Sequence, residues 1–294
     1  TEDILTSPED ADVLDMKLAR AVRSRNANDV ISLLERGAYV NAVRWRDMDA
    51  FPTEHYINVR VADLDNFASQ DIAFGRVIQD AYYSRDVDTM TILMKAGAEL
   101  RFNFDEHFHF THSIVLHAVK YNDRDMLDVF VENGVDLNTH RTFVGGFTPL
   151  FQACRGVTRS PVIDFLVERG ADVDVQSGDP EFGPKLTNVH VCVHLVGGND
   201  AQKLVQLMDH EVDINVFRGS EEWHDSVLQT AMQNADLQGL QQYRAKAKEF
   251  VQTILEYNVD FDFHDIGDQD PGYDVPPEII DLVERKRHEQ SVVY

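Results

Sequence analysis

The six residues Arg169-Gly170-Ala171-Asp172-Val173-Asp174 decide the fold of this chain, because close copies of them recur along its length. Three other copies keep Gly in the second position, and two weaker copies place Glu211 or Asn258 there. In chain order, the other copies are Arg36-Gly37-Ala38-Tyr39-Val40-Asn41, Ala96-Gly97-Ala98-Glu99-Leu100, Asn133-Gly134-Val135-Asp136-Leu137-Asn138, His210-Glu211-Val212-Asp213-Ile214-Asn215 and Tyr257-Asn258-Val259-Asp260-Phe261-Asp262. We call this segment the repeated phrase and its second position the Gly slot. The slots stand at 37, 97, 134, 170, 211 and 258, so successive copies are 60, 37, 36, 41 and 47 residues apart.

An amphipathic run stands before the repeated phrases. Its apolar residues follow the i, i+3, i+4 spacing that predicts a helix with one buried face. The clearest runs are Val30–Leu34, Met126–Val131, Val162–Val167 and Ala201–Met208. A Gly just after such a run suits the left-handed conformation that ends many helices. Asn258 tolerates that conformation, whereas Glu211 adopts it less readily, so we expect the fifth helix to end in a different way.

A second, shorter helix is predicted earlier in each unit. Its best example is Thr148-Pro149-Leu150-Phe151-Gln152-Ala153-Cys154, in which Thr148 is a suitable N-cap and Pro149 fits the first turn. Parallel stretches occupy 113–118, 187–192 and 226–231. A small residue in each short helix would let neighbouring helices approach closely, and these residues are Ala21, Ala81, Ala118, Ala153, Cys192 and Ala231.

The succession of turn, short helix, long helix and repeated phrase resembles the ankyrin repeat, which has a Thr-Pro-Leu-His-x-Ala pattern and a period of about 33 residues. The resemblance covers roughly residues 12–262. Only the fourth repeat has Thr-Pro-Leu, with Phe151 in place of His, and only the fifth has a His in that slot, His190. The resemblance implies an all-α, ankyrin-repeat solenoid of helix-turn-helix units with hairpin loops. It also implies a concave partner surface formed by the hairpin tips and the short helices.

The domain organisation follows from the repeats. We expect an N-terminal extension at 1–11, an ankyrin-repeat array at 12–275, and a C-terminal capping helix and tail at 276–294. Within the array, the repeats are expected to end near residues 41, 101, 138, 174, 215 and 262.

Two insertions and the tail depart from a regular array. One enlarged inter-repeat insertion, about 44–73, contains Tyr56–Val61, which fits a short strand or an added helical turn. A second insertion, about 236–247, is expected to lengthen the helices of the sixth repeat. The capping helix starts at Pro276-Pro277 and is expected to end at the basic residues Arg285-Lys286-Arg287, which would complement its dipole.

The charge of the chain points to the class of its partner. Its 294 residues include 51 Asp and Glu against 27 Lys and Arg, a formal net charge of −24. Nucleic acid and anionic membrane surfaces are bound by Lys and Arg, so the charge argues against both as partners. A basic protein or peptide fits better. No apolar run approaches the roughly 18 residues that a membrane span needs.

The two cysteines and the first residues bear on localisation. Cys154 and Cys192 form no CxxC motif and lie in apolar helical patterns, where a free thiol behaves as a small core residue. The start, Thr1–Leu5, is acidic and lacks the apolar region of a signal peptide. We therefore expect an intracellular, reduced protein, cytoplasmic or nuclear.

No catalytic constellation stands out, and no cofactor is expected. The chain lacks a Gly-rich phosphate loop and a G-x-S-x-G elbow. His107, His109 and His112 form a candidate metal cluster, but a hairpin tip whose His and Phe residues touch a neighbour or a partner is the favoured interpretation. His190 and His194 are spaced like a zinc pair, but the resemblance favours a structural role, with His190 hydrogen-bonded to the backbone at the turn.

Aromatic residues gather at the predicted hairpin tips among acidic residues. Such residues often anchor interfaces, whereas a merely solvated edge rarely carries so many. The candidate partner-binding residues are Trp45, Phe102, Phe104, Phe108, Phe143, Phe182, Phe217, Trp223 and Phe263. An aromatic row in a negative field suits a basic, partly apolar peptide. The alternative is that many of the tip aromatics, which also include Phe147, fold inward and pack along the loops, and the sequence does not decide which of them do.

The sequence therefore predicts a protein–protein interaction scaffold or adaptor that binds a protein or peptide on its concave face. Its oligomeric state stays open. One alternative is an enzyme, or a small-ligand or metal-binding protein, that uses a pocket formed by the insertions. A further alternative is a secreted effector of a pathogen or symbiont that carries ankyrin repeats, which no sequence feature demands.

Overall fold

The computed structural model describes residues 8–41, 43–46, 55–57, 73–100, 113–139, 147–155, 162–176, 186–193, 201–219, 224–233, 241–257, 259 and 275–292. The chain divides into two compact units. The N-terminal unit comprises Thr1–Asp136 and Thr142–Val144, and the C-terminal unit comprises Leu137–Arg141 and Gly145–Tyr294. Both are mostly helical, in agreement with the sequence prediction.

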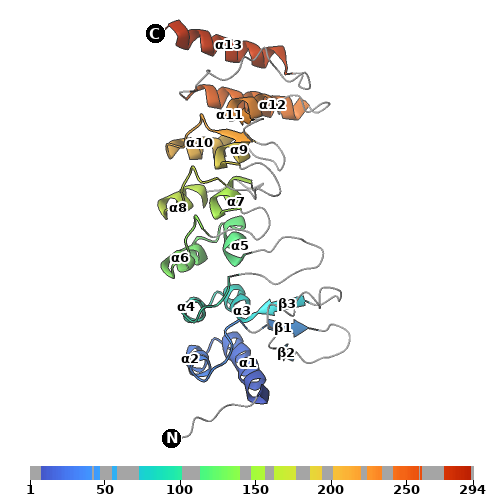
Figure 1. Ribbon diagram of the computed structural model, residues 1–294, viewed down its shortest axis with the longest axis vertical. Coiled ribbons are helices and arrows are strands. Elements are labelled where there is room, and N and C mark those ends of the chain that lie inside the picture. The colour runs from blue at the N-terminus through green and yellow to red at the C-terminus, as the bar shows by residue number, and fades with distance from the viewer. Residues whose placement is uncertain are drawn as a thin grey trace. The chain divides into compact units, whose positions relative to one another are not determined.

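In its described residues, the N-terminal unit contains three helix-turn-helix pairs (Figure 1). Helix α1 packs on α3, α2 on α4, and α4 on α6. The first helix of each pair therefore lies in one layer and the second helix of each pair in another. The helices are α1 (Pro8–Arg23), α2 (Ala27–Glu35), α3 (Val77–Ser84), α4 (Val87–Lys95), α5 (Ile114–Lys120) and α6 (Arg124–Glu132). Helix α1 begins inside the segment 1–11 that the sequence assigns to an extension.

The C-terminal unit repeats this arrangement. Helix α7 packs on α9 and α9 on α11, while α8 packs on α10 and α10 on α12. The helices are α7 (Pro149–Arg155), α8 (Val162–Glu168), α9 (Asn188–Val193), α10 (Ala201–Asp209), α11 (Val227–Gln233), α12 (Gln241–Leu255) and α13 (Pro277–Val292).

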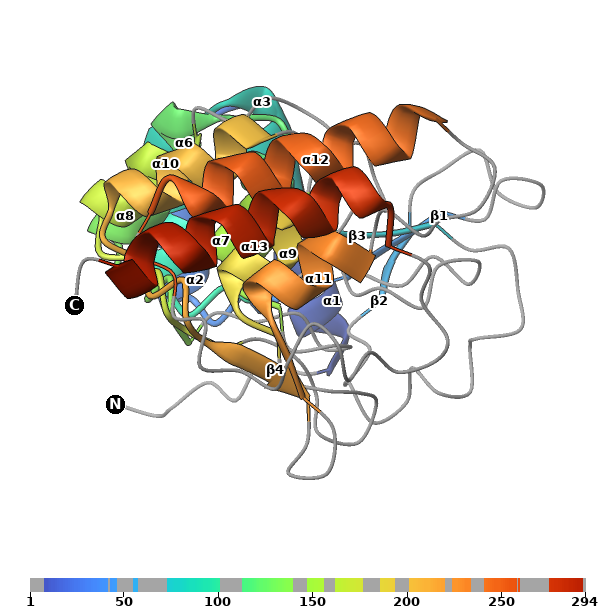
Figure 2. The ribbon, with the colours of Figure 1, turned by 90° about the horizontal axis from the view of Figure 1, so that it is seen from above.

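The last helix, α13, runs alongside α12 (Figure 2). It buries Ile279 and Val283, which are 1% and 0% exposed, and leaves most of its other described residues partly or fully exposed. The expectation that this helix ends at Arg285-Lys286-Arg287 is wrong. Helix α13 continues to Val292, and its last turn holds no basic residue. The basic residues therefore lie mid-helix, where they complement the dipole little.

Short strands occupy two connections. Strand β1 (Val43–Arg46) pairs antiparallel with β2 (His55–Ile57) and with β3 (Ala73–Arg76), in the order β2-β1-β3. Strand β3 continues directly into α3. The start of the Tyr56–Val61 segment is thus a strand, and its residues from 58 onward lie outside the described part. A second hairpin pairs β4 (Phe217–Gly219) with β5 (His224–Ser226).

The core follows the amphipathic pattern of the sequence. Leu93, Leu127 and Leu166 of the second helices are 0% exposed. Burying one such side chain contributes about 1.5–3 kcal/mol relative to leaving it in water. The predicted small residues of the first helices are buried as well, each at most 5% exposed: Ala21, Ala81, Ala118, Ala153, Cys192 and Ala231.

The turn within each pair of the N-terminal unit has a shared design. A residue with positive φ, Arg25 (55°), Arg85 (57°) or Asn122 (53°), comes directly before the N-cap of the second helix. The N-caps Asn26, Asp86 and Asp123 each accept a hydrogen bond from the backbone N–H three residues on.

The first helices have caps of the predicted kind. Thr148 Oγ1 accepts from the N–H of Phe151 at 3.2 Å, which confirms Thr148 as the N-cap of α7, with Pro149 as its first residue. Ser113 likewise caps α5 by accepting from the N–H of Val115 at 3.1 Å.

The Gly slots end the long helices as predicted. Gly37, Gly97, Gly134 and Gly170 have φ between 86° and 96°. At the fourth phrase, Gly170 N–H donates to Val167 O and Ala171 N–H to Leu166 O, both at 2.9 Å.

The fifth phrase ends its helix in a similar left-handed turn, so the expectation of a different ending at Glu211 is wrong. Glu211 takes φ 60°, and its N–H donates to Met208 O at 3.1 Å. This matches the bond from Gly170 to Val167 in position. The next residue, Val212, is 5% exposed, so burial after the turn favours this path despite the unfavourable φ.

The last residue of a repeated phrase connects it to the next one. Asn41 donates from Nδ2 to Gly97 O at 3.2 Å and accepts from Glu99 N–H at 2.7 Å. Asn138 makes the same pair of bonds, to Gly170 O at 2.9 Å and from Asp172 N–H at 2.8 Å. Each amide side chain thus satisfies two backbone groups of the following phrase.

Asp174 is the exception in this series. Its Oδ1 accepts from Asp213 N–H at 3.1 Å, but a carboxylate has no proton to donate to the Gly-slot carbonyl. We call these side-chain connections the rungs between phrases.

Candidate protein-binding surface

Two of the predicted partner-binding residues lie on described strands. Trp45 of β1 is paired with Phe74 of β3 and His55 of β2, and Phe217 of β4 is paired with Ser226. The others lie outside the described residues: Phe102, Phe104, Phe108, Phe143, Phe182, Trp223 and Phe263. The metal candidates His107, His109 and His112 also lie outside them. Whether the nine candidate residues form one surface therefore stays a prediction.

The described residues present a different aromatic cluster, on α3 and α5. We call it the Tyr–His cluster, and it consists of Tyr82, Tyr83, His117 and Tyr121. His117 is at its centre, with ring centroids 5.6 Å from Tyr82, 5.9 Å from Tyr83 and 4.5 Å from Tyr121. The first two pairs are edge-to-face, at 86° and 88°, which is a favoured geometry for aromatic rings.

The helical path separates the two adjacent tyrosines. Successive helix residues point about 100° apart, so Tyr82 and Tyr83 face different surroundings. Tyr82 is 5% exposed and stacks on Phe130 of α6 at 6.2 Å, whereas Tyr83 is 62% exposed. Tyr121 follows the last residue of α5 and is also 62% exposed. Two exposed rings thus flank a half-buried histidine that the core holds in place.

A partly buried hydrogen bond holds the histidine ring. Tyr82 Oη lies 3.0 Å from His117 Nδ1. Burial, and then the nearby Asp123 carboxylate, raise the pKa of Tyr82 well above its usual range. The phenol therefore stays protonated at neutral pH. Burial and Tyr121 also raise the pKa of Tyr83, which keeps its ring neutral as well.

Charged groups border the Tyr–His cluster. Arg85 binds Asp123 with two hydrogen bonds, at 2.7 and 3.0 Å, and also reaches Asp125 at 3.2 Å. The bond and charge of Asp123 raise the pKa of the Arg85 guanidinium. Lys120 Nζ lies 5.5 Å from the centre of the Tyr121 ring, within cation–π range. The Tyr121 ring thus already receives a cation on its face.

The arrangement presents groups that can recognise a ligand. It offers exposed ring faces, phenol hydroxyls and one imidazole, with no Ser or Cys nucleophile among its members. Within the described ranges, no group of three or more His, Cys, Asp or Glu residues is placed to hold a metal ion. No described helix is long and apolar enough to span a membrane.

Two other aromatic positions have structural roles. His190 is 1% exposed, and its Nδ1 lies 2.7 Å from the side-chain Oγ1 of Thr187 at the start of α9, so its structural role is confirmed. The bond to the backbone that the resemblance implies stays a prediction. Phe147 stacks on Phe151 with centroids 4.5 Å apart and planes at 4°, and Arg155 lies over its ring. Phe147 thus follows the alternative in which a tip ring packs inward.

Sequence reasoning missed the Tyr–His cluster because it aligned the repeats on the Gly slot. When the repeats are aligned on their positive-φ residues, Tyr83 stands two residues before Arg85 and Tyr121 stands one residue before Asn122. Aromatic residues at an exposed helix end are the signal that would have identified them.

The chain is similar in sequence to one protein family. Residues 78–177 match the family model described as ankyrin repeats, in three copies, and this segment contains the whole Tyr–His cluster. No curated protein sequence matches the chain significantly.

Solved structures are also similar to the chain. The crystal structure of the human ASB11 ankyrin repeat domain is 19% identical, with a TM-score of 0.44, and the match covers 81% of each chain. The crystal structure of EF0377, an ankyrin repeat protein, is 16% identical, with a TM-score of 0.48, and the match covers 83% of this chain and 98% of that one.

Proposed function

Because this chain is built from ankyrin repeats, with residues 78–177 matching their family model, we propose that it is a non-catalytic scaffold or adaptor that binds a basic protein or peptide. Ankyrin repeats are protein–protein interaction modules in general. We place the partner on the concave face that the resemblance implies, formed by the first helices and the hairpin tips. The observation that carries this proposal is the pair of exposed rings, Tyr83 and Tyr121, held around His117.

The chemistry of these rings favours a basic partner. The face of an aromatic ring is negative and attracts the guanidinium of Arg or the ammonium of Lys. The net charge of −24 attracts the same partner over longer distances. The rings therefore contribute affinity, and the charge increases the rate of encounter.

The tip aromatics remain part of the proposal. Trp45 lies on β1, which pairs with β3, and β3 continues into α3, the helix that carries Tyr83. This supports a surface that extends from the Tyr–His cluster to the tip at Trp45. Replacing Trp45, Phe104 and Trp223 together by Ala tests that extension. A partner that binds this triple variant as tightly as the original chain would exclude the tips from the surface.

Peptide binding tests whether Tyr83 and Tyr121 hold a basic partner. The probes are fluorescent peptides of equal length that are rich in Arg, rich in Lys or rich in Glu, followed by anisotropy. We expect the Arg-rich peptide to bind most tightly and the Glu-rich peptide not to bind. Replacing Tyr83 and Tyr121 together by Ala should weaken the binding of the Arg-rich peptide at least about tenfold, since hot-spot aromatics contribute 2 kcal/mol or more, roughly, when truncated.

A matched control separates this surface from a general loss of aromatic area. Tyr39 is 39% exposed and lies in the first repeated phrase, away from α3 and α5 in sequence. The Tyr39→Ala variant should bind the Arg-rich peptide like the original chain. Equal weakening by Tyr39→Ala and by the double variant would contradict the proposed surface.

We propose an intracellular, reducing location, cytoplasmic or nuclear. Both cysteines are free thiols in the structure, and both are buried in helices, Cys154 in α7 and Cys192 in α9. Cell fractionation of the native protein tests this proposal.

A further inference from the structure

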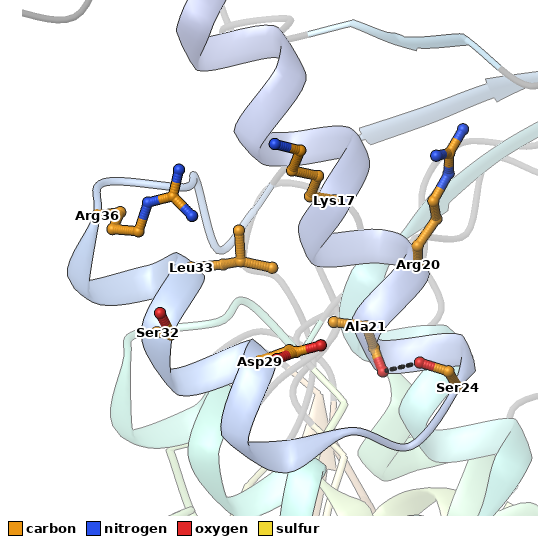
Figure 3. Close-up of a pocket in the computed structure, with 8 residues that line it drawn as sticks. All are labelled: Lys17, Arg20, Ala21, Ser24, Asp29, Ser32, Leu33 and Arg36. Atoms are coloured by element: carbon orange, nitrogen blue, oxygen red, sulfur yellow. Dashed lines mark hydrogen bonds between the residues drawn. The ribbon is translucent and has the colours of Figure 1, made fainter.

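Helices α1 and α2 enclose a cleft of about 440 Å³, drawn in Figure 3. Its volume lies in the range of small-molecule sites, about 300–1,000 Å³. The lining residues are Lys17, Arg20, Ala21, Ser24, Asp29, Ser32, Leu33 and Arg36. Ala21 and Leu33 are buried and form an apolar floor, while the other six are exposed polar or charged residues. The cleft thus combines a small apolar base with a polar rim.

The cleft concentrates positive charge in an acidic chain. Lys17, Arg20 and Arg36 line it, and none of them forms an ion pair with any residue that the structure describes. Asp29 is the one carboxylate among the described residues that line the cleft, and it already accepts a hydrogen bond from Asn26 Nδ2 at 2.7 Å. Counting Arg20 at the rim, three cations minus one carboxylate give the lining residues a charge of +2, although the whole chain carries −24.

The side chains in the cleft are placed to hold one ligand. Lys17 of α1 and Arg36 at the end of α2 extend toward each other from opposite walls, above Leu33 (Figure 3). Ser32 lies on the same wall as Arg36, while Arg20 points away from the gap and stands at the rim. Ammonium, guanidinium and hydroxyl groups are all hydrogen-bond donors. A multiply charged anion is the ligand that these donors complement.

We infer that this cleft is a binding site for a phosphate monoester, with Lys17 and Arg36 as its two clamping residues. A phosphate monoester carries a charge of about −1.5 to −2 and three strong acceptor oxygens, which match the local charge and the donors. A carboxylate carries only one charge and leaves one clamping cation unpaired. The carbon part of the ester rests on Leu33 and Ala21.

The long-range field of the molecule does not remove this preference. At physiological ionic strength, charges more than about 8 Å away are largely screened. The Tyr–His cluster lies on α3 and α5, and none of its residues lines the cleft.

Binding of defined phosphate compounds tests the site on the full chain. The probes are O-phosphoserine, inorganic phosphate, a short peptide with one phosphoserine, and the same peptide with Glu in that position, followed by calorimetry. We expect the phosphopeptide to bind and the Glu peptide to bind at least about tenfold more weakly, because it brings one charge instead of two. The double variant Lys17→Gln with Arg36→Gln should weaken phosphopeptide binding at least about tenfold.

A charge-matched control is available. Lys95 at the end of α4 and Lys248 of α12 are exposed, so Lys95→Gln with Lys248→Gln removes two positive charges outside the cleft. This control should bind the phosphopeptide like the original chain, and thermal melts should show that both double variants are folded. Equal weakening in both double variants, equal binding of the Glu peptide, or no binding of any phosphate probe would overturn the inference.

The same measurements identify the source of the phosphate. Tighter binding of the phosphopeptide than of O-phosphoserine supports a phosphorylated protein as the ligand. Equal binding of O-phosphoserine and the phosphopeptide supports a small phosphorylated metabolite. Both results support the site, provided that the double variant at Lys17 and Arg36 binds these probes more weakly than the original chain does.

Discussion

At the scale of single residues, the positive-φ positions show where side chains override backbone preference. The left-handed region of backbone conformation favours glycine, yet Arg25, Arg85 and Glu211 adopt this conformation. Arg25 Nη2 donates to Ser84 O, and Arg85 binds Asp123, so both arginines connect one turn to the next. Glu211 has no comparable contact in the described structure and is exposed. Its strain is therefore the easiest to relieve.

Replacing Glu211 by Gly should stabilise the protein by about 0.5–1 kcal/mol, because a left-handed L-residue costs roughly 1–2 kcal/mol and the added freedom of Gly in the unfolded chain offsets part of that. Urea denaturation followed by circular dichroism measures the shift.

The opposite kind of change, Gly170→Ala, places a side chain at a left-handed position and should destabilise the protein by about 1 kcal/mol through backbone strain. No atom lies within 4 Å of an added Cβ there, so steric contact is not the cause. A Glu211→Gly variant less stable than the original chain would contradict this account.

At the scale of elements, the rungs between phrases depend on a single functional group. Asn138 both donates and accepts, whereas Asp174 only accepts. Changing Asn138 to Asp should cost about 1 kcal/mol, since it removes one hydrogen bond of typical net value and adds a carboxylate near Asp172. Changing Asp174 to Asn should have the opposite effect, because its amide can donate to Glu211 O. Equal and opposite shifts in the urea midpoint are the expected result, and shifts of the same sign would refute it.

A buried lysine joins two helices of the C-terminal unit. Lys203 of α10 is 2% exposed, and its Nζ donates to Ala153 O and Cys154 O, at 3.2 and 3.3 Å. These two carbonyls belong to the last turn of α7, where C=O groups have no N–H donor within the same helix. Replacing Lys203 by Met should destabilise by about 1–3 kcal/mol, because buried carbonyls lose their donor.

The comparison for this prediction is Lys95→Met, at the exposed end of α4, which should change stability by no more than about 0.5 kcal/mol. Thermal melts of both variants measure the difference. If Lys203→Met were as stable as Lys95→Met, the apolar contacts of α10 alone would hold this pair of helices together.

The helix pairs were predictable because apolar spacing and capping residues act over a few positions. Thr148, Pro149 and Gly170 each act on their own helix, and the structure places them as the sequence predicts. The turn at Glu211 was not predictable from local preference, because tertiary burial of Val212 outweighs it. The Tyr–His cluster was missed for a related reason. Its rings come from two helices of different repeats, and their distances depend on how those helices pack.

At the scale of the whole molecule, charge and fold respond differently to salt. Each unit is held mainly by buried apolar side chains, while the net charge of −24 acts through solvent. Raising the ionic strength from 0.01 to 1 M shortens the Debye length from about 30 Å to about 3 Å. Binding of the Arg-rich peptide should therefore weaken several-fold across this range, while the melting temperature changes little or rises. A melting temperature that falls in parallel with affinity would contradict this separation.

The single-bond rung at Asp174 has a consequence for how the C-terminal unit opens. Two bonds hold Asn138 to the following phrase, and one holds Asp174 to the next. Amide protons report such differences through their exchange with deuterated solvent. The N–H of Asp213 should exchange sooner than the N–H of Asp172, although both are bonded to the preceding phrase. We therefore expect local opening of this unit to begin at the junction between the fourth and fifth phrases, and Asp174→Asn to move that starting point elsewhere.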